Sequence, residues 1–374
     1  MNMRNILFSA VTLDVGGIEN ALVTLVNYLA QLKDEEQNFM YNITLVLEKK
    51  QGVFLDTINK RIKIIEYEPS NNKLILIRKA INFLKQKQFI RQYKNKFDFS
   101  CCYATYSLPA SFVARTASKN SVLWVHSEYM GVLGEKTAYI KFFNNIKIDK
   151  YKKIVFVSKN ACDIFKEVYV LKNKDLLPKI EVINNLINGK KIIHDSNEKI
   201  NDLKKEKIYT FLNISRHTEE DKKISRLIKA ADKLKNAGYK FRLILIGDGK
   251  DSIIYKDMAN KLKLDDKLIF LGKKENPYPY YKLSDCFVLT SEYEGFPVVY
   301  NECRVLGLPI ITTDVSDSKE VIDNKYGVVV EKNVESIFNA MKLAIDNGMK
   351  HCNEFNYEEY NKEIENKIQR LILY

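Results

Sequence analysis

The sequence predicts an α/β protein with two doubly wound parallel sheets, one in each half of the chain. Short apolar strands alternate with helical segments, and the same alternation restarts after a polar, Lys-rich stretch at 189–207. A chain of 374 residues, 46% of them hydrophobic, is also too long for one ordinary core. We therefore expect one domain over 1–188, a second over 189–350 and a final helix over 351–374.

The first half begins as a strand, a helix and a second strand. Its apolar runs are short and do not alternate with polar residues, which is typical of strands buried on both faces of a parallel sheet. A helix is expected to open at the two glycines of 16–32. The expected strands and the turns after them are 5–11, 41–48, 121–129, 153–165 and 179–188.

The second half repeats this pattern, and the C-terminus of one of its helices is marked by a glycine. That helix covers 223–238 and stops at Gly238, a residue that suits a helix C-terminus. Ligands of doubly wound sheets bind at the carboxyl ends of the strands, so the residues after each strand are the candidate site residues. The expected strands are 208–216, 241–249, 267–272, 285–291, 309–314 and 327–330.

Charge and cysteine content restrict the partners and the compartment. Lys and Arg number 60 against 47 acidic residues, and a net charge of +13 favours phosphates, acidic membrane surfaces or nucleic acid. The six cysteines show no metal-binding spacing, so we expect reduced thiols in a cytoplasmic protein without structural zinc. The apolar run 6–8 is too short for a signal-peptide core.

Two glutamates flank a Gly-Phe-Pro turn in the stretch 291–314. The strand ends at Ser291, so Glu294 is expected on the loop and Glu302 a little over one turn into the next helix. Both carboxylates can then face one crevice. The backbone N–H groups at the helix start, with Gly295 allowing close approach, suit a ligand that carries phosphate and sugar hydroxyls.

The segment EGFPVVYNE at 294–302, followed by GLPII, resembles the E-x7-E signature of the retaining glycosyltransferases of family 4, which have the GT-B fold. The resemblance implies two Rossmann-like domains facing across a cleft, with the final helix crossing back to the first. Further matching segments are GGIEN at 16–20, WVHS at 124–127, FVSKN at 156–160, ISRHTEEDKKISRLIKA at 214–230, IGDG at 246–249 and YNKEIENKI at 360–368.

The resemblance gives the two glutamates different roles. It implies that Glu294 contacts the donor sugar, whereas Glu302 holds the ribose hydroxyls of the nucleotide. For an isolated pair we would favour plain loop and helix-start charges by roughly three to one, but the surrounding matches reverse that preference. The donor-binding residues expected between them are Gly295, Phe296, Pro297 and Val298.

The resemblance also implies a clamp for the diphosphate, formed by Arg216 and a following lysine. Lys222 is the favoured lysine, but Lys223 stands where the family usually has glycine, so the register between the two is open. Cations at a helix N-terminus oppose the helix dipole unless an anion is bound. Two lysines at this helix start therefore hint at a phosphate partner.

Three weaker candidates lie at other strand ends. Gly16 and Gly17 open a helix and can direct amides towards the leaving phosphate or the acceptor, although such a pair is usually only a tight turn. His126 ends a strand where the family has a histidine facing the donor sugar, although a lone histidine is more often structural. Asp248 is better explained as a turn residue beside Gly249.

The implied chemistry needs few protein catalysts and no cofactor. In a retaining transfer of this type the leaving diphosphate itself takes the acceptor proton, so the protein mainly positions groups and stabilises charge. The chain has no Asp-x-Asp triplet, so we expect no metal, with Arg216 and Lys222 in its place.

A basic segment at 73–96 is the candidate for the membrane or the acceptor. It holds eight basic residues and no acidic one, mixed with Leu, Ile and Phe at roughly helical spacing. Such a helix suits an anionic membrane, with a lipid-linked saccharide as acceptor, but a helix with a solvated basic face is about equally plausible. The residues expected to attach are Arg78, Lys79, Lys85 and Lys87.

Other functions explain less of the sequence. A GT-B-fold nucleotide-sugar epimerase shares the cleft but should lack the glutamate signature and the crossing helix. A basic nucleic-acid-binding protein should carry a zinc-finger or aromatic RNA-binding motif, and none occurs. An NAD-type oxidoreductase needs G-x-G-x-x-G after the first strand, and this motif does not occur there. We therefore predict a cytoplasmic, peripheral-membrane glycosyltransferase of bacterial-type surface polysaccharide assembly that uses a nucleotide-sugar and binds no nucleic acid.

Overall fold

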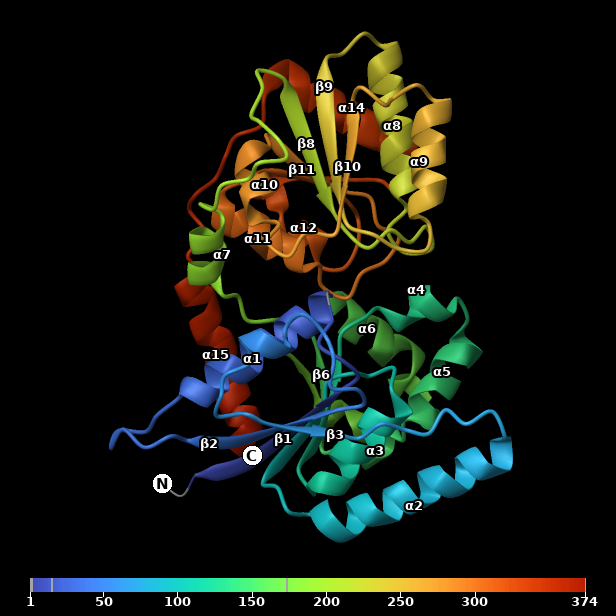
Figure 1. Ribbon diagram of the computed structural model, residues 1–374, viewed down its shortest axis with the longest axis vertical. Helices are drawn as coiled ribbons and strands as arrows, with labels where there is room; N and C mark the ends of the chain where they lie inside the picture. The colour runs from blue at the N-terminus through green and yellow to red at the C-terminus, as the bar shows by residue number, and fades with distance from the viewer. Residues whose placement is uncertain (1–2, 15, 173, 374) are drawn as a thin grey trace. The chain divides into compact units, whose positions relative to one another are not determined.

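The computed structural model describes residues 3–14, 16–172 and 174–373, and the chain divides into two compact units (Figure 1). Unit 1 takes in Met1–Ile187 and Asn361–Tyr374, and unit 2 takes in Asn188–Tyr360. Each unit is built on one parallel β-sheet, so the α/β class expected from the sequence is confirmed.

Unit 1 holds a seven-stranded sheet in the order β3-β2-β1-β4-β5-β6-β7. Every neighbouring pair is parallel, so the carboxyl ends of all seven strands lie along one edge. The strands are β1 (Arg4–Ala10), β2 (Tyr41–Leu47), β3 (Lys63–Glu66), β4 (Phe99–Cys102), β5 (Ser121–Val125), β6 (Lys153–Phe156) and β7 (Ile180–Val182).

The helices of unit 1 pack on this sheet and bury its central strands, whereas the edge strands β3 and β7 are partly exposed. The α-helices are α1 (Gly17–Gln31), α2 (Ile75–Tyr93), α3 (Leu108–Ala117), α4 (Tyr129–Leu133), α5 (Lys136–Asn145) and α6 (Lys159–Val168). Short 3-10 turns are η1 (Leu55–Thr57), η2 (Ile148–Lys150), η3 (Val170–Lys172) and η4 (Lys174–Lys179).

Unit 2 holds a six-stranded parallel sheet in the order β10-β9-β8-β11-β12-β13. Helices α8, α9 and α14 share one core cluster with the sheet, while α7, α10 and α11 pack against one another. The strands are β8 (Tyr209–Ile214), β9 (Phe241–Ile246), β10 (Leu268–Gly272), β11 (Cys286–Leu289), β12 (Ile310–Thr313) and β13 (Gly327–Val330). The helices are α7 (Gly189–Asp195), α8 (Ile224–Asn236), α9 (Ser252–Lys261), α10 (Tyr278–Leu283), α11 (Val298–Leu306), α12 (Ser318–Val321), α13 (Asp323–Tyr326) and α14 (Val334–Asn347).

Helix α15 (Tyr357–Leu373) contains residues of both units. The side chain of Asn361 accepts a hydrogen bond from the backbone N–H of Ile187 at 3.0 Å and donates one to the Ile187 carbonyl at 2.7 Å. The two places where the chain passes between the units, after Ile187 and before Asn361, are therefore held side by side.

The strand order of each sheet reverses once, and these reversals mark the places where a ligand can bind. In unit 1 the chain winds from β1 to β2 and β3 and then returns to place β4 on the other side of β1. In unit 2 it winds from β8 to β9 and β10 and returns to place β11 beside β8. The loops after β8 and β11 both leave the carboxyl edge of the sheet at such a point.

The structure differs from the sequence-based expectation in three places. Strands β3 and β4 have four residues each and were not predicted, because runs this short carry little periodicity. The strand expected within 179–188 has only three residues, β7. The polar stretch 189–207, which was expected to mark the domain boundary, begins with helix α7, whose side-chain cap is Asn188.

The N-cap of helix α8 is a lysine in an unusual backbone conformation. Lys223, its N-cap, adopts the left-handed conformation with φ 49° and ψ 42°, at the position where the resemblance expects glycine. A residue with a Cβ is destabilised there by roughly 1–2 kcal/mol. The native chain therefore carries local strain at the start of this helix.

Replacing Lys223 with Gly should raise the free energy of unfolding by up to about 1 kcal/mol, because relief of strain exceeds the entropy that glycine adds to the unfolded chain. The matched control is Lys229→Gly, on an exposed position inside α8, which should lower it by about 1 kcal/mol. Urea titrations of both variants measure the difference. Equal destabilisation by the two glycines would show that Lys223 is not strained.

Candidate active site

The site of unit 2 is built where the loops after β8 and β11 meet. Lys222, after β8, places its Nζ 2.5 Å from Oε1 of Glu294, after β11. Ser291 donates a hydrogen bond from Oγ to the same Glu294 oxygen at 2.7 Å. The side chains of Lys222 and Glu294 are only 18% and 13% exposed, so the pair is shielded but still reachable from solvent.

Backbone contacts hold these two loops together. The hydroxyl of Thr290 donates to the carbonyl oxygens of Lys222 at 3.1 Å and Lys223 at 3.2 Å. The N–H of Glu292 donates to the carbonyl of Asp221 at 2.7 Å. The loop after β8 therefore has little freedom relative to the loop after β11, and the lysine lies opposite the glutamate as a consequence.

The charge of Lys222 is already compensated within the protein. Glu294 pairs with it directly, and Oδ2 of Asp221 lies 4.0 Å from its Nζ. Carboxylates of the chain itself thus compensate this lysine at the helix start, and the phosphate partner stays a prediction. For the choice between Lys222 and Lys223, the structure shows only that Lys222 contacts Glu294.

Glu302 lies in a different environment, five residues into α11. Its side chain is 8% exposed and accepts hydrogen bonds from the hydroxyls of Tyr281 at 2.5 Å and Tyr278 at 3.4 Å. Burial raises the pKa of this carboxyl, and the two tyrosine hydrogen bonds partly oppose that rise. Sequence reasoning missed both tyrosines, although the aromatic run YPYYKL before β11 is a signal that can be read.

The turn between the two glutamates is well packed. Phe296 is 7% exposed and packs edge-on against Tyr300, and the carbonyl of Gly295 accepts a hydrogen bond from Ser316 at 2.5 Å. Helix α11 then begins at Val298, with Pro297 as N-cap and no side-chain cap. The structure brings Glu294 together with Lys222 and Glu302 together with its tyrosines.

Arg216 lies directly beyond β8 and is exposed, in contrast to Lys222. The next residue, His217, is buried, and its N–H donates to the carbonyl of Asp248 at 3.1 Å. The Asp248 carboxylate accepts from the Gly249 N–H at 2.8 Å and from Ser252 Oγ at 2.6 Å, and these bonds lower its pKa. Asp248 therefore organises the turn after β9 and fixes the segment that carries Arg216.

The candidates of unit 1 lie at the ends of β5 and β1. His126 is 7% exposed, its ring lies 4.1 Å from the ring of Tyr103, and burial lowers its pKa to about 3. The imidazole is therefore neutral near pH 7, and its Nε2 has no hydrogen-bond partner among the described residues. Gly16 is the N-cap of α1 and Gly17 its first residue, and a Cβ at Gly16 would meet the carboxylate of Glu19.

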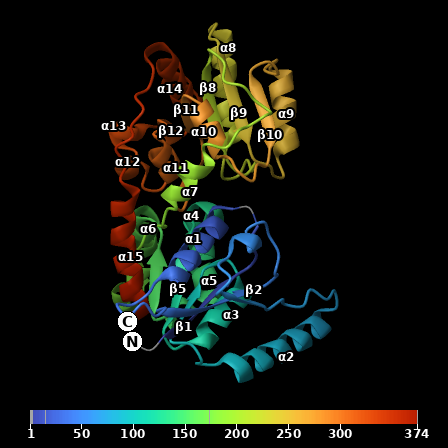
Figure 2. The same ribbon diagram turned by 60° about the vertical axis from the view of Figure 1, so that its left-hand side comes forward.

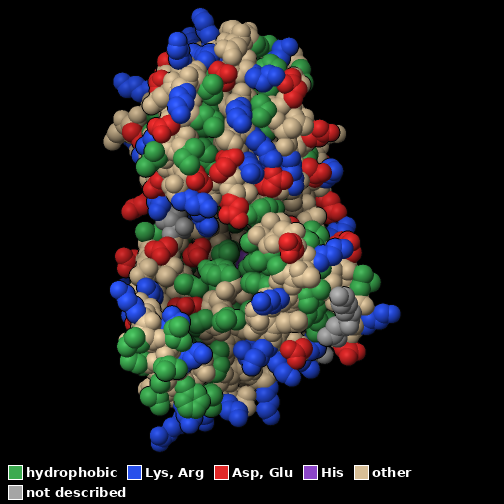
Figure 3. Space-filling model, turned by 90° about the vertical axis from the view of Figure 1, so that its right-hand side faces the viewer, with side chains coloured by type: hydrophobic (Ala, Val, Ile, Leu, Met, Phe, Trp, Pro, Cys, Tyr) green, Lys and Arg blue, Asp and Glu red, His purple; other side chains and the backbone are tan. Residues whose placement is uncertain are grey.

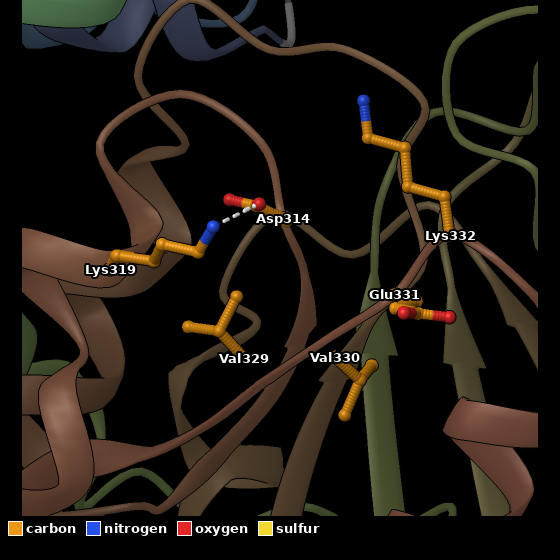
Figure 4. Close-up of a pocket in the computed structure, with 6 residues that line it drawn as sticks. All are labelled: Asp314, Lys319, Val329, Val330, Glu331 and Lys332. Carbon is orange, nitrogen blue, oxygen red and sulfur yellow. Dashed lines mark hydrogen bonds and ion pairs between the residues drawn. The ribbon is translucent and has the colours of Figure 1, made fainter.

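A hollow of ≈ 390 Å³ lies at the ends of β12 and β13 (Figure 4). Lys319 and Asp314 point towards each other there with Nζ and Oδ2 2.5 Å apart, and Lys332 donates to the carbonyl of Glu292. The hollow therefore adjoins the loop of Glu294, but none of the predicted site residues lines it. Its lining is Asp314, Lys319, Val329, Val330, Glu331 and Lys332.

In residues 3–14, 16–172 and 174–373, no helix is long and apolar enough to cross a membrane. Within the same ranges, no group of three or more His, Cys, Asp or Glu side chains is arranged to hold a metal ion. Metal-independent transfer stays a prediction.

Known proteins resemble this chain in sequence. Curated relatives include an uncharacterized glycosyltransferase of Methanocaldococcus jannaschii, 27% identical over 204 residues, which are 49% of each chain. Another is the N-acetylgalactosamine-N,N'-diacetylbacillosaminyl-diphospho-undecaprenol 4-alpha-N-acetylgalactosaminyltransferase of Campylobacter jejuni, 29% identical over 34% of this chain and 35% of that protein. The matched segments thus span about half or less of these relatives.

The fold and the family model extend the comparison. HepE of Anabaena, solved in complex with UDP-glucose, aligns over 98% of this chain and 100% of its own with a TM-score of 0.78 at 15% identity. That likeness shows the fold, which is GT-B. The family model of glycosyl transferases group 1 matches residues 195–362, which include Arg216, Lys222, Glu294 and Glu302. Residues 195–362 therefore match the glycosyl transferases group 1 family, and the chain as a whole has the GT-B fold.

Proposed function

We propose that the protein is a retaining glycosyltransferase that moves a sugar from a nucleotide-sugar to a saccharide or lipid-linked saccharide. This proposal rests on one observation: Glu294 contacts Lys222 and Ser291 where the strand order of unit 2 reverses. A shielded cation and a carboxylate in one crevice suit a ligand that has both an anionic diphosphate and sugar hydroxyls. The site lies within the segment that matches the family model.

Each candidate residue has a distinct task in this proposal. Arg216 and Lys222 bind the diphosphate and stabilise the charge that develops on it as the bond to the sugar breaks. Glu294 accepts hydrogen bonds from hydroxyls of the donor sugar, and Glu302 accepts them from the ribose. His126, neutral because of its burial, offers a hydrogen bond to a sugar hydroxyl.

The transfer step itself needs no base from the protein. The acceptor hydroxyl attacks the anomeric carbon from the face that the diphosphate leaves, its proton passes to a phosphate oxygen, and the new glycosidic bond keeps the donor's configuration. In this scheme Lys222 exchanges its contact with Glu294 for a contact with the diphosphate. No metal is required, because the two cations neutralise the leaving group.

We further propose that the acceptor is lipid-linked and that the enzyme works at the inner face of the cell membrane in surface polysaccharide assembly. The Campylobacter jejuni relative is named for transfer to a diphospho-undecaprenol-linked sugar, and the basic helix α2 offers a surface for anionic lipids. Helix α2 carries Arg78, Lys79, Lys85 and Lys87.

A donor screen tests the main proposal. We expect the purified protein to bind or slowly hydrolyse at least one of a panel of UDP-, GDP- and ADP-sugars, measured by calorimetry and by release of the nucleoside diphosphate. Released sugar should keep the anomeric configuration of the donor in NMR spectra. Inverted product would contradict the retaining mechanism, and failure of every nucleotide-sugar to bind would contradict the enzyme proposal itself.

Glutamate variants test the division of roles. Glu302→Ala should weaken binding of the nucleoside diphosphate, whereas Glu294→Ala should leave that affinity nearly intact and reduce turnover, since a charge-assisted hydrogen bond is worth roughly 1.5–3 kcal/mol, or about 10- to 100-fold. Because Glu294 pairs with Lys222, its removal also frees the lysine for the diphosphate. Glu335→Ala, on α14, is the control. Equal loss of nucleotide affinity in both site variants would show that the roles are not divided.

The pH dependence of nucleotide binding tests the tyrosine contacts of Glu302. If ionised Glu302 binds the ribose, affinity should fall as the pH decreases through its raised pKa. Tyr281→Phe removes a hydrogen bond that stabilises the carboxylate, so the loss should move to higher pH. The matched control is Tyr280→Phe on the same helix, whose hydroxyl instead contacts Asp202. Identical profiles for wild type and Tyr281→Phe would contradict this role.

A further inference from the structure

Helix α2 is exposed along most of its length, which is unusual for a helix in a parallel α/β sheet. Phe89 is its single buried residue, and the helix contacts α3 through its C-terminal half. Figures 1 and 2 show that its first turns, with the extended segment before them, project beyond the sheet. The projecting part is Leu74–Lys87, which we call the α2 tip.

The other end of the helix is firmly attached to unit 1. Phe89 belongs to a core cluster with Leu7, Val46, Val113 and Ala117. Its ring also lies 4.8 Å from the ring of Tyr93 and 5.2 Å from that of Tyr67. These contacts hold the helix by its second half. Within the α2 tip, Asn82 accepts a hydrogen bond from the Ser70 N–H at 2.7 Å and Lys85 donates one to the Glu68 carbonyl at 2.7 Å, while the large apolar side chains stay exposed.

The α2 tip exposes large apolar side chains that no folded neighbour covers. Leu76 is 81% exposed and Leu84 64%. Seven of the twenty large hydrophobic side chains exposed by the described chain lie between 74 and 90, so this is a concentration rather than a scatter. The seven are Leu74, Ile75, Leu76, Ile77, Phe83, Leu84 and Ile90.

Helical spacing gathers several of these side chains into one stripe. Leu76 and Phe83 are seven residues apart, as are Ile77 and Leu84, and two helical turns place such pairs on the same face. Lys87 continues the stripe, with its Nζ 4.5 Å from the centre of the Phe83 ring. Its stem covers apolar surface while its charge stays at the edge, as expected for a lysine at a membrane interface.

The charge around the stripe has one sign. The segment 73–96 contains no Asp or Glu, and none of its cations forms an ion pair among the described residues. Figure 3 shows hydrophobic and basic side chains together at this lower end of the molecule, with few acidic ones. An apolar stripe flanked by Lys and Arg complements an anionic bilayer, whereas nucleic acid would leave the apolar side chains in water.

The geometry points to the α2 tip as a membrane-inserting element. Leu76, Ile77, Phe83 and Leu84 enter the boundary between headgroups and acyl chains of an anionic bilayer, and Arg78, Lys79, Lys85 and Lys87 bind the lipid phosphates. This inference rests on the membrane attachment in the proposed function and adds to it that apolar insertion, and not charge alone, holds the protein there.

Vesicle binding of the full chain tests this inference. Phosphatidylcholine vesicles with and without phosphatidylglycerol are sedimented with wild type, with Leu76→Ser/Ile77→Ser/Phe83→Ser/Leu84→Ser, and with Arg78→Gln/Lys79→Gln/Lys85→Gln/Lys87→Gln. We expect wild type to bind the anionic vesicles, the serine variant to lose about 100-fold or more in partitioning, and the glutamine variant to lose about 1,000-fold. The matched control is Ile253→Ser/Ile254→Ser, which removes exposed apolar side chains from α9 of unit 2 and should bind like wild type.

A second readout reports depth directly. Trp124 is the only tryptophan of the chain and is 2% exposed, so it serves as an internal reference. In a Leu76→Trp variant, the added tryptophan should shift its emission to shorter wavelength on anionic vesicles and be quenched by lipids brominated on the acyl chain. Circular dichroism confirms that each variant is folded.

The outcomes separate the inference from the proposal on which it rests. Absence of wild-type binding to anionic vesicles overturns both the membrane attachment and the insertion. Wild-type binding that the serine variant retains, without quenching in Leu76→Trp, leaves the attachment in place and overturns the insertion. A wild-type dimer that becomes monomeric in the serine variant, with vesicle binding unchanged, assigns the stripe to a contact between copies of this chain.

Discussion

The hydrogen bonds from the Thr290 hydroxyl to the carbonyls of Lys222 and Lys223 are the constraint on which the site of unit 2 depends. They tie the loop after β11 to the loop after β8, at the point where the strand order of the sheet reverses. This brings Lys222 on one loop next to Glu294 on the other, and the two side chains form an ion pair. The strain accepted at Lys223 belongs to the same arrangement, because its left-handed backbone lies at the end of that tied loop.

The two glutamates of the signature differ because their surroundings differ. Glu294 lies beside a cation and a serine hydroxyl and is partly exposed, whereas Glu302 is buried against two tyrosine hydroxyls on α10. Burial raises the pKa of the Glu302 carboxyl, so this group is harder to ionise than an ordinary glutamate. The two carboxylates that flank one turn of the chain therefore lie in chemically different surroundings.

One helix of unit 1 is largely exposed to solvent. Most helices of a parallel sheet bury an apolar face, but α2 buries Phe89 and presents Leu, Ile and Phe side chains to its surroundings. The exposure of α2 uncovers little of the sheet, because the edge strand β3 is short and partly exposed. The helix is thus fixed at one end by packing, and its other end keeps its apolar side chains exposed.

The alternation of strands and helices, the loop position of Glu294 and the helical position of Glu302 follow from the sequence, because each depends on local periodicity and on turn residues such as Gly295 and Pro297. The four-residue strands β3 and β4 escaped prediction because so short a run has no measurable period.

Tertiary structure alone decided the partners. Lys222 and Glu294 are 72 positions apart, and Glu302 meets its tyrosine from 21 positions away, so no local pattern records either contact. The same holds for exposure: the sequence of 73–96 is compatible with a packed helix and with a free one. Only the assembled sheet, which covers Phe89 and leaves Leu76 in solvent, distinguishes the two, because burial is a property of distant segments that meet in space.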